Sequence, residues 1–301
     1  MSRQAPAKLN LGLHVLRKRS DGYHDLETVF VRINWCDQIS VKGAERLSLT
    51  SDDPMLTNED DNLCLRAARI LQSEFGVSGG AEVDLHKKIP MGAGLGGGSS
   101  DAATTLLLLN KLWRLGCSNA ELRALGARLG SDVPAFMHET PALGTGRGEI
   151  LSTLTEKRFG DRPRGQSSDR SGDRAARPLE IPFSFAVLKP DVHISTAEAY
   201  GSIVPDDRRR PDLAVVIRSL DLDRWKVELV NDFEAPIAGR HSGIAEALTL
   251  LRTSGAGYAA MAGSGSAVFG VFERASDAAN AARAGLHKGL TTWNGCVYQP
   301  M

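Results

Sequence analysis

The sequence predicts an α+β protein, and three observations lead to that prediction. Segments with the two-residue period of strands and segments with the helical period both occur in each half of the chain. They are mixed irregularly, without the regular strand–helix alternation that builds a doubly wound parallel sheet. Hydrophobic residues make up 42% of the 301 residues, which is enough for a sizeable core and suggests about two domains of roughly 150 residues each.

The N-terminal half begins with an alternating segment at 7–15, in which Leu9, Leu11, Leu13 and Val15 share one face. This pattern predicts a half-buried strand, and a polar turn follows it. After the turn, the sequence predicts three further strands, near 27–33, 39–41 and 47–50.

Three helices are expected in the same half. Residues 62–75 place apolar side chains at helical spacing, behind Asn62 as a candidate N-cap. An alternating strand at 81–86 and a glycine-rich turn lead to an Ala/Leu-rich helix at 99–113. A third, amphipathic helix at 119–129 ends at a glycine, a residue that often terminates helices.

Residues 156–178 interrupt this pattern, because they contain almost no large apolar side chains and mix Arg, Asp, Gly, Ser and Pro. We interpret them as a flexible loop or linker between domains at 1–155 and 179–301. A nucleic-acid-binding arm is rejected, since acidic residues interrupt the arginines and Phe159 is the single aromatic residue among them. The remaining elements are expected at strand 183–188, helix 241–252, strand 267–272, helix 275–286 and strand 296–298.

The charge balance argues against nucleic-acid and membrane partners. Lys+Arg and Asp+Glu are both 36, so there is no global field to attract an anionic surface, and any anion must be held locally. The four cysteines are far apart and form no Cys-x-x-Cys, which suits a reducing compartment. No apolar run has the length of a signal peptide or a membrane span, so we expect a cytoplasmic protein.

A glycine-rich turn at 90–101 is the most informative segment. Its five glycines let bare backbone approach a ligand, and the helix that follows offers unpaired N–H groups, so a phosphate site is expected. It differs from a dinucleotide-binding loop, because the preceding strand has a polar face, and from a P-loop, because Gly97 is followed by Gly98 where a lysine is required. A second glycine cluster, at 263–266, is either a plain turn or a second loop that binds the same phosphate ligand, such as a triphosphate.

Several motifs occur together in one order along almost the whole chain. They are Pro6–Leu11, Arg19–His24, Pro90–Ala103, Gly130–Pro134, Gly146–Glu149, Asn231–Glu234 and Gly263–Ser266. In this combination the sequence resembles the GHMP small-molecule kinases and, among them, the CDP-methylerythritol kinase family. The resemblance implies an N-terminal domain like the second domain of ribosomal protein S5, a ferredoxin-like C-terminal domain, and an active site between them.

The resemblance also implies a reaction, the ATP-dependent phosphorylation of the 2-hydroxyl of 4-diphosphocytidyl-2-C-methyl-D-erythritol in the non-mevalonate route to isoprenoid precursors. Asp132 matches the general base of the family, and Lys8 matches the lysine that keeps this carboxylate ionised and lowers the pKa of the acceptor hydroxyl. Without the resemblance, Asp132 reads as a turn former and Lys8 as a strand residue facing water. A second role for Asp132 also stays open, in which it orients the acceptor hydroxyl and does not take its proton.

Substrate-binding residues are carried over from the same motifs. Tyr23 and Tyr200 are expected to sandwich the cytosine while His24 reads its polar edge, and Asn10 and Thr196 are expected to contact the substrate. Tyr200 has the alternative of a partly buried helix residue. The segment before it departs from the family at one position, where Asp191 replaces the usual glycine.

The ATP site implied by the resemblance comprises Asn62, Lys87, Pro90, Met91, Gly92, Ala93, Gly94, Leu95, Gly96, Gly97, Gly98, Ser99 and Ser100. Asn62 could equally serve as the helix cap. Magnesium is expected to arrive as Mg-ATP, with Ser100 as its candidate contact, and the sequence shows no ligand cluster for a transition metal.

Two other functions remain open at this stage. A homoserine-, mevalonate- or galactose-type kinase would keep both glycine loops, but it would have no need of the Asp21–His24 motif together with Tyr200. A non-catalytic ligand sensor of the same fold would be expected to have lost Lys8 or Asp132. The oligomeric state cannot be inferred from the sequence.

Overall fold

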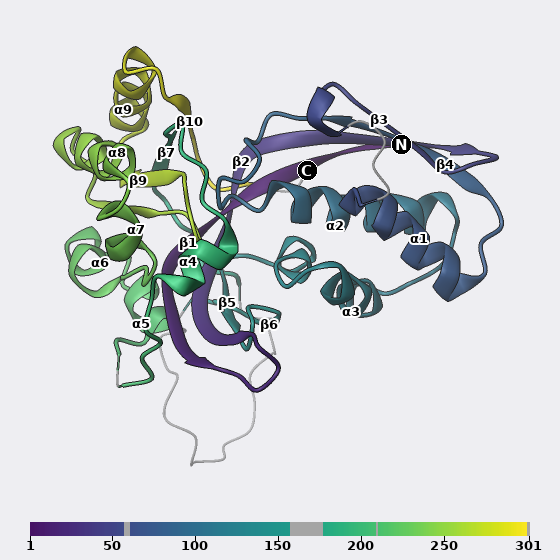
Figure 1. Ribbon diagram of the computed structural model, residues 1–301, viewed down its shortest axis with the longest axis horizontal. Helices are drawn as coiled ribbons and strands as arrows, with labels where there is room; N and C mark the ends of the chain where they lie inside the picture. The colour runs from purple at the N-terminus through teal and green to yellow at the C-terminus, as the bar shows by residue number, and fades with distance from the viewer. Residues whose placement is uncertain (57–60, 157–176, 209, 300–301) are drawn as a thin grey trace, which may run out of the picture.

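Two β-sheets form the framework of the computed structural model, which describes residues 1–56, 61–156, 177–208 and 210–299 (Figure 1). The larger sheet contains β1 (Ser2–Lys18), β2 (His24–Ala44), β3 (Ser48–Ser51), β4 (Gly80–His86), β5 (Ala142–Thr145) and β6 (Ile150–Thr153). Its order is β3-β4-β2-β5-β6 with β1 paired to β2, and only the β3–β4 pair is parallel. The smaller sheet is antiparallel in the order β10-β7-β9-β8, from β7 (Ser184–Lys189), β8 (Tyr258–Met261), β9 (Val268–Phe272) and β10 (Thr291–Gly295).

Helices pack against both sheets. Beneath the larger sheet lie α1 (Leu63–Phe75), α2 (Gly97–Leu112) and α3 (Asn119–Leu129). Two short 3-10 turns are η1 (Pro54–Leu56), which follows β3, and η2 (Val133–Met137), which follows α3. Their apolar residues share a core with β2 and β4. The other half carries α4 (Thr196–Gly201), α5 (Leu213–Arg218), α6 (Leu222–Glu228), α7 (Glu234–Ala238), α8 (Ser242–Thr253) and α9 (Ala275–His287). Within it, α8 and α9 pack on β7 and β9. The mixed α+β fold is thereby confirmed.

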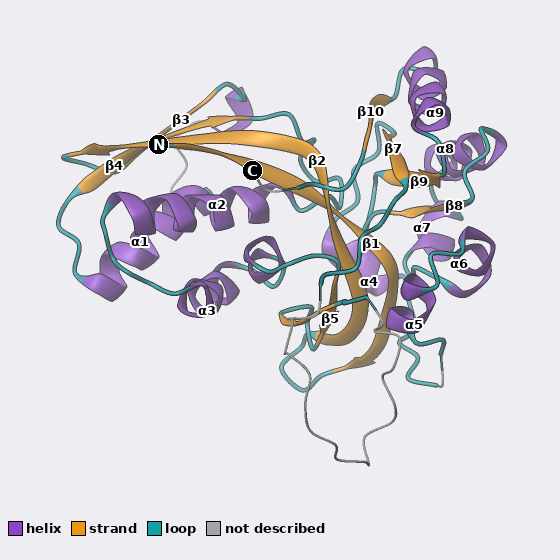
Figure 2. Cartoon of the chain, turned by 180° about the vertical axis from the view of Figure 1, so that it is seen from behind, coloured by secondary structure: helices purple, strands orange, loops and turns teal. Residues whose placement is uncertain are grey.

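The β1–β2 hairpin joins the two halves, and Figure 2 shows its two long strands curving across the molecule. Leu9 and Leu11 pack in a core that includes β7 and β9, so both halves share that core. The expectation of a half-buried strand at 7–15 is wrong, because every residue of β1 from Ala5 to Val15 is buried. The polar side chains between the leucines, Lys8 and Asn10, line a cavity instead of facing water.

Most other predicted elements are present with shifted bounds. The two strands expected at 27–33 and 39–41 are one continuous strand, β2, which curves without a break. The closing strand expected at 296–298 is wrong: β10 ends at Gly295, and Val297 makes only an isolated bridge with Ile33. The reason is that the chain leaves the smaller sheet there and crosses to β2, where Tyr298 N–H donates to Arg32 O at 2.9 Å.

Short elements were not anticipated by periodicity, among them β5, β6, β8 and α4 to α7, because each is too short to show a period. Of the predicted loop 156–178, residues 157–176 lie outside the described part of the chain. Its two ends lie side by side, since Glu156 N–H donates to Arg177 O at 3.1 Å. Among the described helices, none combines the length and hydropathy needed to span a bilayer.

Candidate active site

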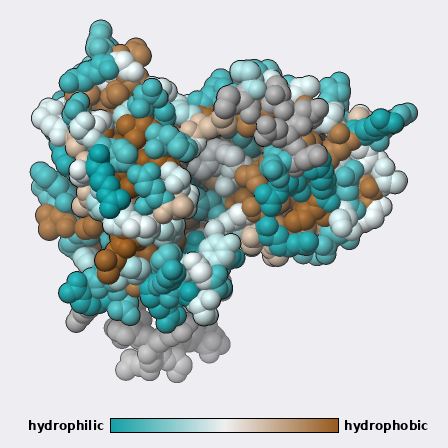
Figure 3. Space-filling view, viewed as in Figure 1, coloured by the Kyte–Doolittle hydropathy of each residue, from teal (hydrophilic) through white to brown (hydrophobic). Residues whose placement is uncertain are grey.

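A cavity of about 840 Å³ lies between the two halves, and residues from both of them line it. The lining includes the glycine-rich segment before α2 and the 263–265 turn, together with Thr196 and Tyr200 of α4. Apolar residues on the face shown in Figure 3 form separate patches among polar ones. The cavity therefore offers a large site that draws on residues far apart in the sequence.

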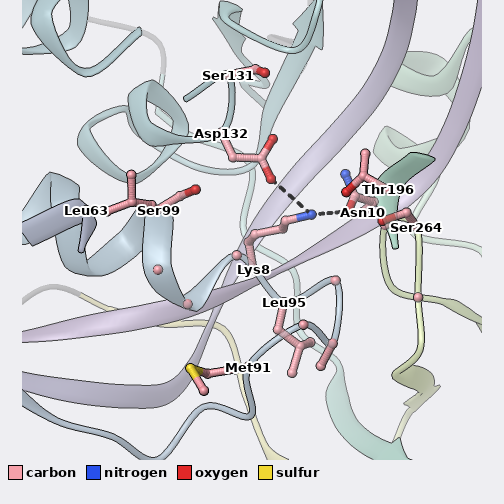
Figure 4. Close-up of a pocket in the computed structure, with 18 of the residues that line it drawn as sticks. Lys8, Asn10, Leu63, Met91, Leu95, Ser99, Ser131, Asp132, Thr196 and Ser264 are labelled. Atoms are coloured by element: carbon pink, nitrogen blue, oxygen red, sulfur yellow. Dashed lines mark hydrogen bonds and ion pairs between the residues drawn. The ribbon is translucent and has the colours of Figure 1, made fainter. Parts of the chain in front are cut away.

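Lys8 and Asp132 meet inside this cavity. Lys8 Nζ lies 3.4 Å from Asp132 Oδ2 and donates a hydrogen bond to Asn10 Oδ1 at 2.6 Å. Figure 4 shows the lysine reaching between these two partners. Asn10 Nδ2 in turn donates to Thr28 Oγ1 at 3.0 Å, which fixes the amide so that its oxygen faces the ammonium group. The buried lysine is thus paired and held in one position.

Asp132 is available for chemistry, because its carboxylate is not used to hold the local turn. It precedes η2, but its side chain makes no capping hydrogen bond. Its side chain is 35% exposed, against 6% for Lys8. The turn-former interpretation therefore does not account for this carboxylate, and the water-facing interpretation of Lys8 is wrong.

The glycine-rich segment is a backbone cradle that presses against β1. Lys8 N–H donates to Leu95 O at 2.9 Å. Gly96, with φ of +70°, directly precedes α2, and a Cβ there would lie 2.9 Å from Phe136 and 3.1 Å from Lys8. The first N–H groups of α2, at 97–99, belong to residues that line the cavity. Unpaired N–H groups at a helix N-terminus are suited to phosphate oxygens.

The second glycine cluster contacts the first one directly. A Cβ on Gly94 would lie 2.0 Å from Ala262 O, and Ala267 N–H donates to Ala93 O at 3.1 Å. Asn231 supports this turn from beneath, because its Nδ2 donates to Met261 O and to Gly263 O, both at 2.8 Å. The interpretation of 263–266 as a plain, unrelated turn is therefore not supported, since the two loops form one wall of the cavity.

Lys87 lines the cavity, but its ammonium group is held by two buried carboxylates. Nζ donates to Asp37 Oδ2 at 2.5 Å and to Asp101 Oδ2 at 2.8 Å. Asp37 also accepts the N–H groups of Lys88 and Ile89, so this cluster anchors the segment that enters the glycine loop. Burial raises the pKa of Asp101 to about 7, against the opposing effect of Lys87.

Asn62 serves as the helix cap that its alternative interpretation described. Its Oδ1 accepts the N–H of Cys64 at 2.8 Å, at the start of α1. The residue also lines the cavity beside the glycine loop, so the cap does not remove it from the site.

Aromatic rings gather at the other end of the cavity. His24 stacks on Tyr200 with ring centroids 4.5 Å apart and an interplanar angle of 19°, and Phe233 meets Tyr200 edge-on at 5.0 Å. The expected sandwich of a base between Tyr23 and Tyr200 is not preformed, because His24 already covers one face of Tyr200. Tyr23 is 54% exposed, with the Arg147 guanidinium 4.8 Å from its ring centroid.

The structure brings all but one of the predicted site residues to the cavity lining. The exception is Ser100, which is fully buried behind Ser99 and whose hydroxyl has no hydrogen-bond partner among the described residues. Among all the residues that the structure describes, no group of three or more His, Cys, Asp or Glu side chains is arranged to hold a metal ion.

Sequence reasoning missed four residues that shape the site. They are Asp37, Asp101, Arg147 and Asn231. Three of them lie in or beside motifs that carried the resemblance, but no role was assigned to them. Asp37 had no local signal, because a single Asp in a strand acquires its role only from the lysine that the fold places beside it.

Comparison with protein families agrees with this site. Residues 62–140 match the family model described as "GHMP kinases N terminal domain", and residues 215–289 match the one described as "GHMP kinases C terminal". A 4-diphosphocytidyl-2-C-methyl-D-erythritol kinase of Salinibacter ruber is 44% identical over 95% of this chain and 93% of its own length. The kinase of the same name from Prosthecochloris aestuarii is 41% identical over 94% of this chain and 92% of its own length.

Solved structures show the same relationship. A crystal structure of 4-(cytidine 5'-diphospho)-2C-methyl-D-erythritol kinase superposes with a TM-score of 0.79 and 32% identity, covering 99% of this chain and 100% of that one. Mevalonate kinase from Methanococcus jannaschii shares only the fold, with a TM-score of 0.70, 12% identity, and coverage of 99% of this chain and 98% of that one. With relatives of such identity matched almost from end to end, this chain belongs to the 4-diphosphocytidyl-2-C-methyl-D-erythritol kinase family of the GHMP kinases.

Proposed function

We propose that the protein transfers the γ-phosphoryl group of ATP to the 2-hydroxyl of 4-diphosphocytidyl-2-C-methyl-D-erythritol, in the non-mevalonate route to isoprenoid precursors. The observation that carries this proposal is the Lys8–Asp132 pair, at 3.4 Å, between the glycine cradle and the aromatic cluster of one cavity. A phosphate donor and a nucleoside-bearing acceptor could thus meet at a base. The family membership of the chain supports the same reaction.

The acceptor hydroxyl lies, in this proposal, within hydrogen-bond reach of Asp132. The carboxylate accepts the proton as the hydroxyl oxygen attacks the γ-phosphorus, and the bond between that phosphorus and the leaving oxygen of ADP breaks. Lys8 stabilises the negative charge that develops between acceptor and phosphoryl group, because its ammonium is fixed between Asp132 and Asn10.

The triphosphate lies, in this proposal, along the glycine cradle at the N-terminus of α2. Gly94 and Gly96 let the cradle pack closely against its protein neighbours, and the N–H groups at the start of the helix supply donors for phosphate oxygens. Magnesium enters bound to ATP and neutralises phosphate charge, with phosphate oxygens and water as its main ligands. The hydroxyl of Ser100 has no partner in the described chain, but it is buried outside the cavity lining, so we propose no direct contact between this serine and the ion.

The cytidine lies, in this proposal, at the aromatic end of the cavity. Tyr23 offers an exposed ring for stacking, and His24 offers ring nitrogens for the polar edge of the base. Thr196 and Asn10 lie between this end and Asp132 as contacts for the methylerythritol part. We also propose domains at 1–155 and 179–301, since the segment between them leaves and returns at neighbouring positions.

The test is a kinase assay that couples ADP release to an optical signal. We expect ATP consumption with the CDP-alcohol and at most background rates with homoserine, mevalonate or galactose. Mass spectrometry of the product should show one added phosphate on the methylerythritol part. ATP consumption with one of the other three alcohols and none with the CDP-alcohol would contradict the proposal. Nucleotide binding without turnover of any alcohol would favour a sensor.

A further inference from the structure

Arg147 lies at the tip of the β5–β6 hairpin and lines the same cavity. It is flanked by Gly146 and Gly148, whose φ angles of +68° and +103° make the tight turn. Leu26 N–H of β2 donates to Gly146 O at 2.7 Å, which fixes the turn against the larger sheet. The turn therefore delivers the arginine to the cavity at a defined position.

The guanidinium has a free hydrogen-bonding edge. Glu149 accepts the backbone N–H of Arg147 at 2.6 Å and Nε at 3.4 Å. In the part of the chain that the structure describes, the two terminal nitrogens Nη1 and Nη2 have no hydrogen-bond partner. The guanidinium carbon lies 4.8 Å from the centroid of the Tyr23 ring. A guanidinium that is placed over a ring and held through Nε can present both terminal nitrogens to an anion.

The two lysines of the cavity lining already have carboxylate partners. Lys8 is paired with Asp132, and Lys87 is held by Asp37 and Asp101. Arg147 is paired with Glu149 through a single contact of 3.4 Å. The neighbouring carboxylate of Asp21 has a lowered pKa, chiefly because Arg19 donates hydrogen bonds to it, with a smaller effect from the charge of Arg147. Arg147 is therefore the lining cation with the most capacity for a further anion.

We propose that Arg147 binds the diphosphate of the acceptor substrate and so makes the site specific for a nucleoside diphosphate over a nucleoside. The inference rests on the proposed function, because it requires the base at Tyr23 and the reacting hydroxyl at Asp132. A diphosphate joins these two parts of the substrate, so it must cross the space between the Tyr23 end of the cavity and the Lys8–Asp132 pair. Arg147 lies over the ring of Tyr23 and lines the cavity that also holds this pair.

The arginine has two functions in this arrangement. Its face orients Tyr23 for stacking on the base, and its terminal nitrogens form charge-assisted hydrogen bonds with the phosphate oxygens. These two functions predict different losses when the side chain is changed. Loss of the positive charge should affect ligands that carry phosphates, whereas loss of the planar face should affect every ligand that carries the base.

Calorimetric titration of cytidine, CMP and CDP against the full-length protein separates these effects. For wild-type protein we expect CDP to bind more tightly than cytidine, with a gain that shrinks as salt is raised. Arg147→Met should lower the affinity for CDP by about 10- to 100-fold, the usual worth of charge-assisted hydrogen bonds, while cytidine loses less than about threefold. In the kinase assay the same variant should raise KM for the CDP-alcohol and leave KM for ATP unchanged.

Two further variants guard against a purely structural effect. Arg147→Lys keeps the charge without the planar face, so it should retain most of the gain from cytidine to CDP. Arg17→Met removes a surface arginine of β1 whose side chain is 72% exposed, and it should behave like wild type. Equal losses for cytidine and CDP in Arg147→Met, or no loss, would overturn the inference while leaving the proposed function intact. Wild-type protein that binds none of the three ligands would overturn the proposed function and the inference with it.

Discussion

The two ends of the cavity are built in different ways. At the proposed phosphate end, the wall is largely main chain: the glycine segments at 92–98 and 263–265 touch each other, and the first residues of α2 line the cavity. At the acceptor end, the wall is made of side chains, from the β1–β2 turn, the β5–β6 turn, α4 and Phe233. A main-chain wall tolerates little change in the local sequence, whereas a side-chain wall depends on how distant segments meet.

This difference suggests which part of the reaction each end controls. In the proposed function the glycine cradle binds any triphosphate, because backbone N–H groups contact phosphate oxygens and not the rest of the molecule. The acceptor end holds aromatic rings and a cation in a combination suited to a pyrimidine nucleoside diphosphate. Specificity for the alcohol should therefore be changed by substitutions at the acceptor end, and loss of all activity should follow from damage to the cradle.

The largest effect is expected from Gly96→Val. Gly96 has φ of +70°, and its added side chain would press on Phe136 and Lys8, so the cradle cannot keep its shape. We expect ATP binding to be abolished while cytidine binding persists, as measured by titration with each ligand. Gly98→Ala is the matched variant, because a Cβ there meets only Leu63 at 3.6 Å. An unchanged affinity of Gly96→Val for ATP would show that this loop is not the phosphate site.

The next effect in size concerns the chemical step, where the two ends meet. Asp132→Asn should lower kcat by about 10²- to 10⁴-fold, which is the usual contribution of positioned proton transfer. Both substrates should still bind, because the amide keeps the shape of the carboxylate. Lys8→Met should also lower kcat, and the double variant should be little worse than the worse single variant, since the pair acts as a unit.

Single-turnover rates decide between two roles of Asp132. If the carboxylate only orients the hydroxyl, the amide oxygen can still accept its hydrogen bond, and the rate of Asp132→Asn should stay within about fivefold of wild type. Such a result would remove the general base from the mechanism. The binding of each substrate must be measured separately, so that a change in affinity is not taken for a change in the chemical step.

The sequence was most informative where the chain itself forms the structure. The glycine cradle, the α1 cap at Asn62 and the alternation of β4 are local, and each was predicted from a few adjacent residues. The burial of β1 on both faces could not be predicted, because part of what covers Lys8 and Asn10 comes from segments more than eighty residues away, at Leu95, Asp132 and Gly263. His24 on Tyr200 is a contact of the same kind, between a hairpin and a short helix.

A moderate effect is expected at the acceptor end. His24→Ala or Tyr23→Ala should raise KM for the CDP-alcohol by roughly 5- to 150-fold, since stacking of a base on an aromatic ring is worth about 1–3 kcal/mol. KM for ATP should stay nearly unchanged, because neither residue touches the cradle. Phe75→Ala, an exposed ring at the end of α1, is the control for loss of an aromatic side chain elsewhere. An equal rise of both KM values would mean that Tyr23 and His24 support the fold and not the base.

The smallest effect is expected where the chain contributes to neither end. Residues 160–177 are polar and lie almost wholly outside the described part of the chain, between ends that are already joined by the hydrogen bond from Glu156 to Arg177 and by a bridge from Thr155 to Pro178. A short Gly/Ser connection that replaces most of them and keeps Arg177 has little distance to span, so the cavity should keep its shape. We expect kcat, both KM values and the melting temperature to stay close to those of the intact protein. A tenfold loss of activity in a deletion variant that melts normally would show that this segment takes part in catalysis or substrate binding, and the interpretation as a linker would be wrong.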